Sequence, residues 1–244
     1  MEIDLKELIR RGTHLGHKAQ RTNPKMFKYI FKRKNNVDII DLRKTITLLK
    51  KAYDFIIDMV AKTGKKVLFV GTKLQAKNIV EEVAKEVECP YVNERWIGGT
   101  LTNFDIVIKQ VAKLNELESI KQNEEKLKSY SKKEISKLQR IFKKLHRNYA
   151  GLKKIDGLPG VIVVIDPDKE IASVREATIK KIPIIALIDT DGDPDLVTIP
   201  IPCNDEALRV IQYILPILAN AVKEGLERRK KEQVENMELA KVAQ

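Results

Sequence analysis

The chain has 244 residues, of which 43% are hydrophobic, and its 46 Lys and Arg against 34 Asp and Glu leave a net charge of +12. This length fits one large domain or two modest ones, and the apolar content excludes a disordered chain. Two cysteines are too few for a disulfide scaffold, the first residues lack the apolar core of a secretory signal, and the longest apolar runs are too short to span a bilayer. We therefore expect a folded protein of a reducing compartment, with no membrane segment.

The positive charge is concentrated in two segments. Residues 1–51 carry a net +9 and residues 109–154 another +9, whereas residues 52–108 carry −1 and residues 155–244 carry −5. One lysine-rich run is typical of a solvated surface, but two separate basic segments indicate a polyanionic partner, nucleic acid or an anionic membrane surface. We expect the acidic 155–244 segment to point away from that partner, toward other proteins.

The N-terminal segment predicts a helix followed by a basic hairpin. The helix is expected from Asp4, a typical N-cap residue, to Gly12. Apolar residues at 27–31 and 37–40, separated by a Lys-Asn-Asn turn, predict two short strands. Asp41 then caps a helix whose apolar residues recur every three or four positions up to Val60.

Most of the remaining chain alternates strands with helices. Bounded apolar runs, typical of buried parallel strands, occur at 66–71, 161–165, 184–188 and 197–201. Amphipathic helices are expected at 76–87, from about 169, and from Asp205 to about Gly225. This alternation predicts an α/β fold, a parallel sheet with helices on both faces. Right-handed crossovers place the loops at 71–73, 166–168 and 189–195 along one edge.

The middle of the chain breaks this rhythm and predicts an inserted pair of helices. Apolar residues three and four apart run from Phe104 to Leu117 and, behind a capping-box sequence that begins at Ser131, from Ile135 to Tyr149. We interpret 103–150 as an antiparallel coiled-coil hairpin whose apolar stripe is its own seam. The predicted division is an α/β domain made of 1–102 and 151–225, the inserted hairpin at 103–150, and a charged, flexible tail at 226–244.

Some motifs leave a metal- or nucleotide-dependent hydrolase as the alternative function. Gly71-Thr72-Lys73 follows a strand, but a phosphate-binding P-loop needs two glycines at a different spacing. The Asp-rich run 189–195 is similar to a metal loop, yet Pro194 and Pro200 stand where an EF-hand requires glycine and glutamate. The chain has no nucleophile elbow and no zinc-protease motif. We expect no enzyme activity.

His14 and His17, three residues apart, are the candidates for a structural metal site. Zinc needs three or four ligands, so carboxylates such as Asp189 or Asp205 would have to complete it. The alternative is that both histidines form only hydrogen bonds. We predict no cofactor and no small-molecule substrate.

The stretch from Tyr91 to Phe104 is the most unusual in the chain. It holds the only tryptophan, Trp96, beside Arg95, followed by a Gly98-Gly99 pair that allows close approach of the backbone. Two interpretations stay open. Either Arg95 and Trp96 bind a partner, or the stretch is an elaborate turn that starts the hairpin.

Nine blocks of residues are distinctive in their order and spacing. They are GTHLGH (12–17), NPKM (23–26), YIF (29–31), IIDLRKT (39–45), LFVGTK (68–73), YVNERWIGGTLTNF (91–104), DPDKE (166–170), DTDGDPD (189–195) and NDEALR (204–209). Together they resemble the bacterial-type protein-two family of the small ribosomal subunit over nearly the whole chain. Two places depart from that family: Asp191-Gly192, where Asn and then Cys or Ser are expected, and Cys203, where glycine is usual.

The resemblance implies a flavodoxin-like α/β domain with an inserted coiled-coil hairpin, in agreement with the patterns above. It implies a structural, non-enzymatic protein of the small ribosomal subunit, in the cytoplasm or, if the chain is organelle-encoded, in the organelle stroma or matrix. The implied partners are small-subunit ribosomal RNA, bound late in assembly, and other small-subunit proteins. Among these is the large mRNA-binding protein one, which the chain would help to dock.

The candidate RNA-binding residues are cations of the two basic segments. In the first segment they are Arg21, Lys25, Lys28, Lys32 and Arg33. In the second they are Lys137, Arg140, Lys143, Lys144 and Arg147, with Arg95 near the start of the hairpin. Because A-form RNA hides its base edges in a deep groove, we expect these side chains to contact phosphates and to read shape rather than sequence.

Overall fold

The computed structural model describes residues 3–123 and 130–242, with side chains up to residue 235. Helix α1 (Leu5–Arg11) begins at the predicted cap Asp4, whose side chain accepts a hydrogen bond from the Lys6 N–H, and ends at Gly12. Helix α2 (Leu42–Thr63) begins after Asp41, also as predicted, and ends at Gly64 in the left-handed conformation.

Between these helices lies a small antiparallel sheet. Its strands are β1 (Leu15–Lys18), β2 (Ile30–Lys34) and β3 (Val37–Ile40), arranged in the order β1-β3-β2. The short 3₁₀ helices η1 (Ala19–Arg21) and η2 (Pro24–Tyr29) connect β1 to β2. The predicted hairpin is confirmed as β2 and β3, although residues 27–29 belong to η2 rather than to the strand.

The main sheet has five parallel strands. They are β4 (Val67–Val70), β5 (Tyr91–Val92), β6 (Val161–Ile165), β7 (Ile184–Ile188) and β8 (Ile199–Pro202). Their order is β5-β4-β6-β7-β8, which, counted within this sheet, is the 2-1-3-4-5 order of flavodoxin-like folds. The predicted parallel sheet is confirmed, and the order of connection reverses between β4 and β6, the position at which such sheets usually bind ligands.

The strands are buried on both faces, because successive side chains point to opposite sides of the sheet. Val67 and Phe69 of β4 belong to one buried cluster, and Leu68 and Val70 to the other. Each side chain of this size contributes about 1.5–3 kcal/mol when fully buried. The apolar runs of the sequence therefore correspond to strands that hold two layers of helices together.

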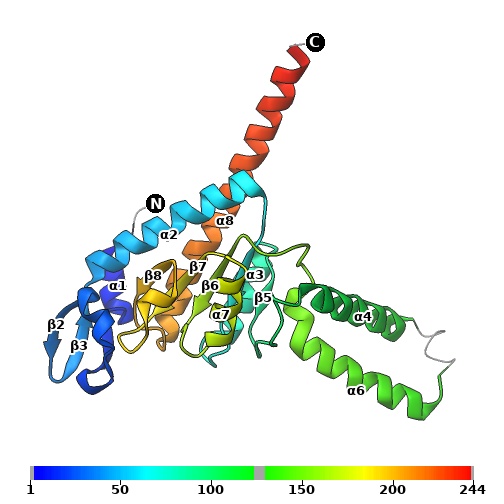
Figure 1. Ribbon diagram of the computed structural model, residues 1–244, viewed down its shortest axis with the longest axis horizontal. Coiled ribbons are helices and arrows are strands. Elements are labelled where there is room, and N and C mark those ends of the chain that lie inside the picture. Colours follow the sequence, from blue (N-terminus) through cyan, green and yellow to red (C-terminus); the bar gives the residue numbers. More distant parts are fainter. Residues whose placement is uncertain (1–2, 124–129, 243–244) are drawn as a thin grey trace.

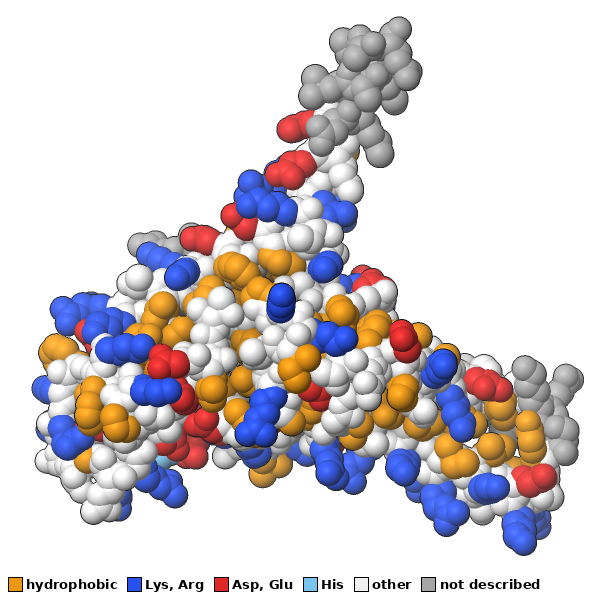
Figure 2. Space-filling model, in the orientation of Figure 1, with side chains coloured by type: hydrophobic (Ala, Val, Ile, Leu, Met, Phe, Trp, Pro, Cys, Tyr) orange, Lys and Arg blue, Asp and Glu red, His pale blue; other side chains and the backbone are white. Residues whose placement is uncertain are grey.

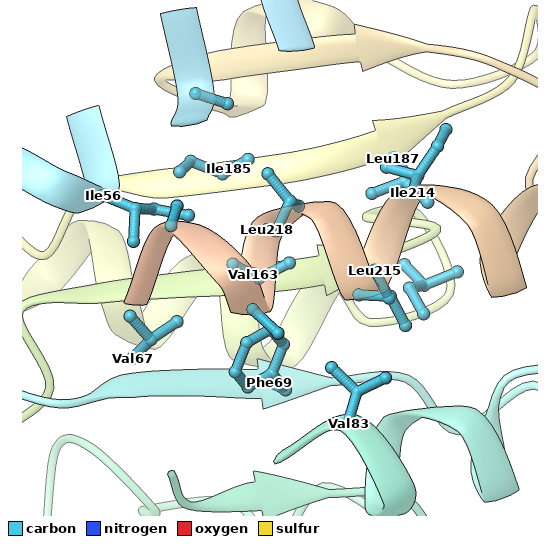
Figure 3. Close-up of a cluster of buried hydrophobic side chains, with 14 of the residues drawn as sticks. Ile56, Val67, Phe69, Val83, Val163, Ile185, Leu187, Ile214, Leu215 and Leu218 are labelled. Atoms are coloured by element: carbon cyan, nitrogen blue, oxygen red, sulfur yellow. The ribbon is translucent and has the colours of Figure 1, made fainter. Parts of the chain in front are cut away.

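Helices α2, α3 (Lys77–Glu86) and α8 (Leu208–Val242) cover the first face. Figure 3 shows Ile214, Leu215 and Leu218 of α8 pointing onto the strands. The other face is covered by α7 (Ile171–Ile179), by the loop that contains Trp96, and by the base of the inserted helices. Helices thus lie on both faces, as predicted.

The inserted segment forms helices α4 (Phe104–Gln122) and α6 (Lys132–Tyr149). Figure 1 shows them running in opposite directions and projecting together from the side of the sheet. Ser131 and Glu134 form the predicted capping box at the start of α6. Val107, Leu114 and Leu145 are buried where the two helices meet the body. The short 3₁₀ helix η3 (Ala150–Leu152) then leads back to the sheet.

The end of α8 differs from the prediction, which placed it near Gly225 and the tail after it. The helix continues to Val242 and projects beyond the sheet, as Figure 1 shows. Gly225 has another role: a Cβ there would lie 2.8 Å from Val60 and 3.0 Å from the Ile57 carbonyl oxygen, so glycine lets α8 approach α2. Beyond it, the Arg228–Glu232 pair at 3.0 Å supports another helical turn. Flexibility of residues 226–244 stays a prediction.

Cys203, where the resembling family usually has glycine, needs no glycine here. Its backbone avoids the left-handed region, its side chain is fully buried, and its N–H donates to the Ile188 carbonyl at 2.9 Å. Among the helices within the described ranges, none combines the length and the apolar content required to cross a membrane.

Candidate nucleic-acid interface

The candidate RNA-binding cations lie at two ends of the molecule. We define the N-terminal patch as Arg21, Lys25, Lys28, Lys32 and Arg33, and the hairpin patch as Lys137, Arg140, Lys143, Lys144 and Arg147. The first set belongs to η1, η2 and β2 and the second to α6, which lie at opposite ends of the long axis in Figure 1. Figure 2 shows Lys and Arg side chains gathered at both ends. The fold thus presents two separate basic surfaces.

The hairpin patch has fewer ion pairs than the N-terminal patch. All five side chains are exposed, and only Arg147 forms an ion pair with a described carboxylate, that of Glu94 at 3.8 Å, while Lys137 lies near enough to Glu134 to help lower its pKa. Lys132 and Lys133 extend the same row toward the start of α6 and are exposed as well. Arg95, which precedes α4, is also exposed and forms no ion pair with a described residue. This end of the molecule therefore carries charge that the protein does not neutralise.

Two lysines of the N-terminal patch are neutralised within the molecule. The ammonium of Lys25 lies 2.6 Å from the Asp193 carboxylate and 3.2 Å from that of Asp195, and Lys28 lies 3.4 Å from Asp195. The Asp-rich loop therefore contacts the patch, and the expectation that the acidic segment points away from the polyanionic partner stays a prediction. Exposed ion pairs typically contribute only about 0–1 kcal/mol, so a phosphate group can replace either carboxylate.

Arg33 forms an ion pair with a buried carboxylate, that of Asp38. Its Nε lies 2.6 Å from Asp38, whose side chain is only 1% exposed. The Arg33 guanidinium, together with the Thr22 hydroxyl, holds the pKa of Asp38 below its ordinary value, although burial acts in the opposite direction. Arg33 thus stabilises the small sheet, whereas Arg21 and Lys32 are the patch cations that have no ion pair with any described residue.

His17 connects the N-terminal segment to the same acidic loop. Its Nδ1 lies 3.4 Å from Asp189 and 3.5 Å from Asp191, and its Nε2 lies 3.8 Å from Glu206. The contact with Asp189 is the main cause that raises the pKa of His17 to about 9, against the opposing effect of burial. The imidazole is therefore protonated near neutral pH and attracts the loop to the small sheet.

The four candidate metal ligands do not come together. His17 contacts Asp189, but Asp205 lies 2.5 Å from the Lys73 ammonium, and the Nδ1 of His14 is buried with no hydrogen-bond partner. Within the ranges that the structure describes, no group of three or more His, Cys, Asp or Glu side chains is placed to hold a metal ion. His17 contacts carboxylates through ion pairs, whereas the Nδ1 atoms of His14 and His17 have no hydrogen-bond partner, so the hydrogen bonds of the alternative are not observed at these two atoms.

Lys73 occupies the rim of the sheet where β4 and β6 end. Its ammonium lies between Asp205, at 2.5 Å, and Asp166, at 2.7 Å. Burial disfavours the charged lysine, but the two carboxylates raise the pKa of Lys73 above its ordinary value, and burial raises the pKa of Asp205 to about 7. Because the cation is already held by two carboxylates, this rim does not offer a phosphate site for a nucleotide.

Comparison with known proteins decides the identity of the chain. The sequence profile of the family described as ribosomal protein S2 matches residues 8–225. The chain belongs to this family. Within the S2 family, it is 45% identical over 227 residues to small ribosomal subunit protein uS2 of Roseiflexus sp. (strain RS-1), with 93% of this chain and 86% of that relative covered.

Two further S2 relatives show that the match extends over whole proteins. Small ribosomal subunit protein uS2 of Chloroflexus aurantiacus (strain ATCC 29366 / DSM 635 / J-10-fl) is 45% identical over 231 residues, which cover 95% of this chain and 96% of the relative. The protein of the same name from Borreliella burgdorferi (strain ATCC 35210 / DSM 4680 / CIP 102532 / B31) is 43% identical over 223 residues, or 91% and 85% of the two chains. This S2 protein is therefore a structural constituent of the small ribosomal subunit, and the hydrolase alternative is wrong.

The Trp96 stretch of this S2 protein is organised by a residue that the sequence analysis missed. The buried carboxylate of Glu176 accepts hydrogen bonds from the Trp96 indole N–H at 2.9 Å and from the backbone N–H groups of Gly99, Leu101 and Thr102 at 2.8, 2.9 and 3.0 Å. Burial opposes ionisation, but these donors hold the pKa of Glu176 below its ordinary value. No sequence motif surrounds Glu176. The only sequence signal of its burial is its position in an apolar helix, between Val174 and Ala177.

The contacts of Glu176 decide between the two interpretations of this stretch. Trp96 is only 8% exposed and its N–H donates to Glu176, which favours the interpretation of this stretch as a turn. Gly99 has a φ of +91°, a conformation that favours glycine. A Cβ at Gly98 would meet open space, so the backbone requires glycine only at position 99. Arg95 stays exposed beside this turn.

Proposed function

We propose that this S2 protein binds small-subunit ribosomal RNA through the hairpin patch and, at its other end, through the N-terminal patch. The observation that supports the proposal best is the exposed row of cations along α6, because Lys137, Arg140, Lys143 and Lys144 form no ion pair with a described residue. A surface that keeps several like charges solvated is typical of a site for a polyanion. With one patch at each end, the protein would bridge two RNA segments.

The projecting helices would act as an arm. We propose that α4 and α6 form a coiled-coil hairpin, and that residues 103–150 are a unit distinct from the α/β body at 1–102 and 151–225. Burial of Val111 and Leu117 on α4 and of Leu145 on α6 supports a shared seam. Such an arm carries its cations away from the sheet, where they reach RNA that the body cannot contact.

The contacts would be made to phosphates, so affinity should depend steeply on salt. If about six phosphates are neutralised, the slope of log K against log salt concentration is about −4 to −5. A slope near zero would contradict the electrostatic model. Docking of protein one belongs to the same proposal and rests on the sequence resemblance. We expect particles that lack this S2 protein to retain less protein one.

The test is charge reversal on the arm. The variant Lys143→Glu, Lys144→Glu, Arg147→Glu should lose association with small subunits in a sucrose gradient while keeping the circular dichroism spectrum of the parent. The matched control reverses three exposed lysines outside both basic patches, Lys180, Lys230 and Lys231. The control has the same net charge, so a loss specific to the arm variant is due to position rather than to total charge.

Sedimentation of the parent protein itself completes the test. Co-migration with small subunits at low salt and partial release at high salt are the expected results. Normal incorporation of the arm variant would show that its cations are only a solvated surface. If the parent protein stays at the top of the gradient at both salt concentrations, RNA docking is refuted.

A further inference from the structure

One exposed turn next to the arm contains a glycine that the protein's own fold does not require. Gly98 and Gly99 are the central residues of this turn, in which the Thr100 N–H donates to the Ile97 carbonyl oxygen at 3.0 Å. The φ of +91° at Gly99 is typical of a type II turn, which needs glycine at that position only. A Cβ at Gly98 would meet no atom within 4 Å, and the φ of Gly98 lies outside the left-handed region. The described fold therefore gives no reason for glycine at position 98.

We propose that this turn, together with Arg95 and Asn103 beside it, is a docking site for the sugar-phosphate backbone of ribosomal RNA, which lies against the bare peptide of Gly98. Glycine has no side chain to keep a ligand at a distance, so a partner can contact its peptide group directly. The inference rests on the RNA binding proposed above and deepens it, because it adds a contact on the α/β body to those on the arm.

The turn presents hydrogen-bond donors that the protein leaves unused. Arg95 is exposed and forms no ion pair with a described residue. The N–H of Gly98 donates to no residue in the described ranges, whereas the N–H of Gly99 donates to Glu176 at 2.8 Å. Asn103 lies beside Gly99, is exposed, and does not cap α4 with its side chain. Guanidinium, amide and backbone N–H groups are those that commonly contact the phosphate oxygens of nucleic acids.

A buried carboxylate holds the turn in place from the protein side. Glu176 accepts hydrogen bonds from the Trp96 indole before the turn and from the Leu101 and Thr102 N–H groups after it. Both ends of the turn are therefore anchored to one residue of α7. A surface that is already ordered loses little conformational entropy when a ligand binds, so the unused donors are preorganised.

The surroundings of the turn favour RNA over a protein partner. Arg147 of the hairpin patch lies 3.8 Å from Glu94, the residue before Arg95, so the turn continues that patch onto the body. Glu94 is also paired with Lys77, at 3.1 Å. Counting Asp105 in the first turn of α4, three cations face two carboxylates at this junction. Together with the unpaired cations of the arm, this excess attracts a polyanion.

The test adds a side chain at Gly98 and measures the affinity of the purified protein for small-subunit particles that have been depleted of it. Gly98→Leu should weaken binding about 5- to 100-fold, the equivalent in affinity of a typical overpacking cost, and Gly98→Ala should weaken it less. The melting temperature of Gly98→Ala should equal or exceed that of the parent, because alanine is compatible with this backbone. Binding that is lost while the fold is kept separates a docking role from a structural one.

Gly157 is the matched control. A Cβ there also meets no atom within 4 Å, but Gly157 precedes β6 and so lies at the opposite edge of the parallel sheet from the turn, which follows β5. Gly157→Leu should change the affinity by less than about threefold. If it weakens binding as much as Gly98→Leu, the loss is not specific to the turn and the proposal is overturned.

Salt dependence tests the phosphate contact of Arg95. Arg95→Gln should weaken binding and reduce the slope of log K against log salt concentration by about one. An unchanged slope would overturn the phosphate contact at this turn.

Particles whose RNA contains 4-thiouridine identify the partner directly. Irradiation should cross-link the RNA to the peptide that holds residues 95–103. If Gly98→Leu weakens binding but cross-links are confined to the hairpin patch, RNA is not the ligand of the turn and the proposal is overturned. If the parent binds with the expected salt slope and Gly98→Leu binds equally well, only the site at the turn is refuted. If the parent does not bind at all, RNA docking is refuted together with it.

Discussion

The hydrogen bonds to the buried carboxylate of Glu176 are expected to stabilise the fold, and a substitution at this residue tests that expectation. It accepts five hydrogen bonds, from the Trp96 indole, from three backbone N–H groups and from the Thr102 hydroxyl at 3.1 Å. The change Glu176→Ala removes the acceptor for all of them. Two of the donors, the Trp96 indole and the Leu101 N–H, are buried, whereas the others are only partly buried and can be reached by water.

The expected loss of stability follows from those two buried donors. Each buried group left without a partner costs about 1–3 kcal/mol, which gives about 2–6 kcal/mol for both. Removing the carboxylate also removes the cost of burying its charge, so we expect a loss of about 3 kcal/mol in the free energy of unfolding. This is a large fraction of the roughly 5–15 kcal/mol that holds a typical domain together.

Urea denaturation provides the assay, followed by two signals. Far-ultraviolet circular dichroism reports on the whole fold, and fluorescence of the only tryptophan, Trp96, reports on the loop that Glu176 holds. In the variant, Trp96 emission should shift to longer wavelength before the helical signal is lost. Glu176→Gln, which keeps one acceptor oxygen, should lose less than Glu176→Ala.

A glutamate outside this network gives the control. Glu116 on α4 is exposed, and Glu116→Ala should change the free energy of unfolding by less than about 0.5 kcal/mol. The pKa of Glu176 is below its ordinary value, so its contribution is present above pH 4.5 and is lost as the pH falls through the lowered value. If Glu176→Ala unfolds with the free energy of the parent and with unchanged Trp96 emission, these hydrogen bonds do not stabilise the fold.

Three further predictions concern the junction of the two sheets and the arm. The pKa of His17 is raised to about 9, so its stabilising charge is fully present below pH 6.5 and lost as the pH rises through 9. Between pH 6 and pH 9.5 the parent should lose about 1–2 kcal/mol more than His17→Gln, and an equal loss in urea denaturation would refute the role of His17. At Gly151 a Cβ would lie 2.2 Å from the Tyr91 carbonyl oxygen. Gly151→Ala should therefore cost about 1–3 kcal/mol, whereas Gly157→Ala, which meets no atom within 4 Å, should be nearly neutral; similar melting temperatures for the two would contradict this. Ser131→Ala should remove about 1 kcal/mol from α6 by breaking its capping box, which hydrogen exchange would detect as faster exchange in the first turn of that helix and nowhere in the sheet.

Much of the fold could be predicted because its strands and helices differ in their local patterns. The runs at 161–165 and 184–188 are apolar at every position and bounded by turns, which marks a strand buried on both faces. Strand β5 was missed because two residues, Tyr91 and Val92, carry no periodicity. The end of α8 was misplaced because a glycine that allows two helices to approach looks, in sequence, the same as one that ends a helix.

The candidate site was predictable only as a set of charges. The sequence shows that Lys25 and Lys143 lie in basic segments, but Lys25 is paired with a carboxylate 168 positions away. Only the packing of the small sheet against the loop after β7 creates that pair, so no local pattern contains it. The same holds for Glu176, whose partners lie about 75 positions earlier in the chain.

The contacts between the small sheet and the Asp-rich loop also set the order in which the protein can assemble during its own synthesis. Gly16, His17, and Lys25 are made early, yet they dock on Thr190, Asp189 and Asp193. At about 5–20 residues per second, the loop is translated roughly 10–40 s after the chain begins. For that interval His17, Lys25 and Lys28 lack their acidic partners on the loop and are free to contact whatever polyanion surrounds them.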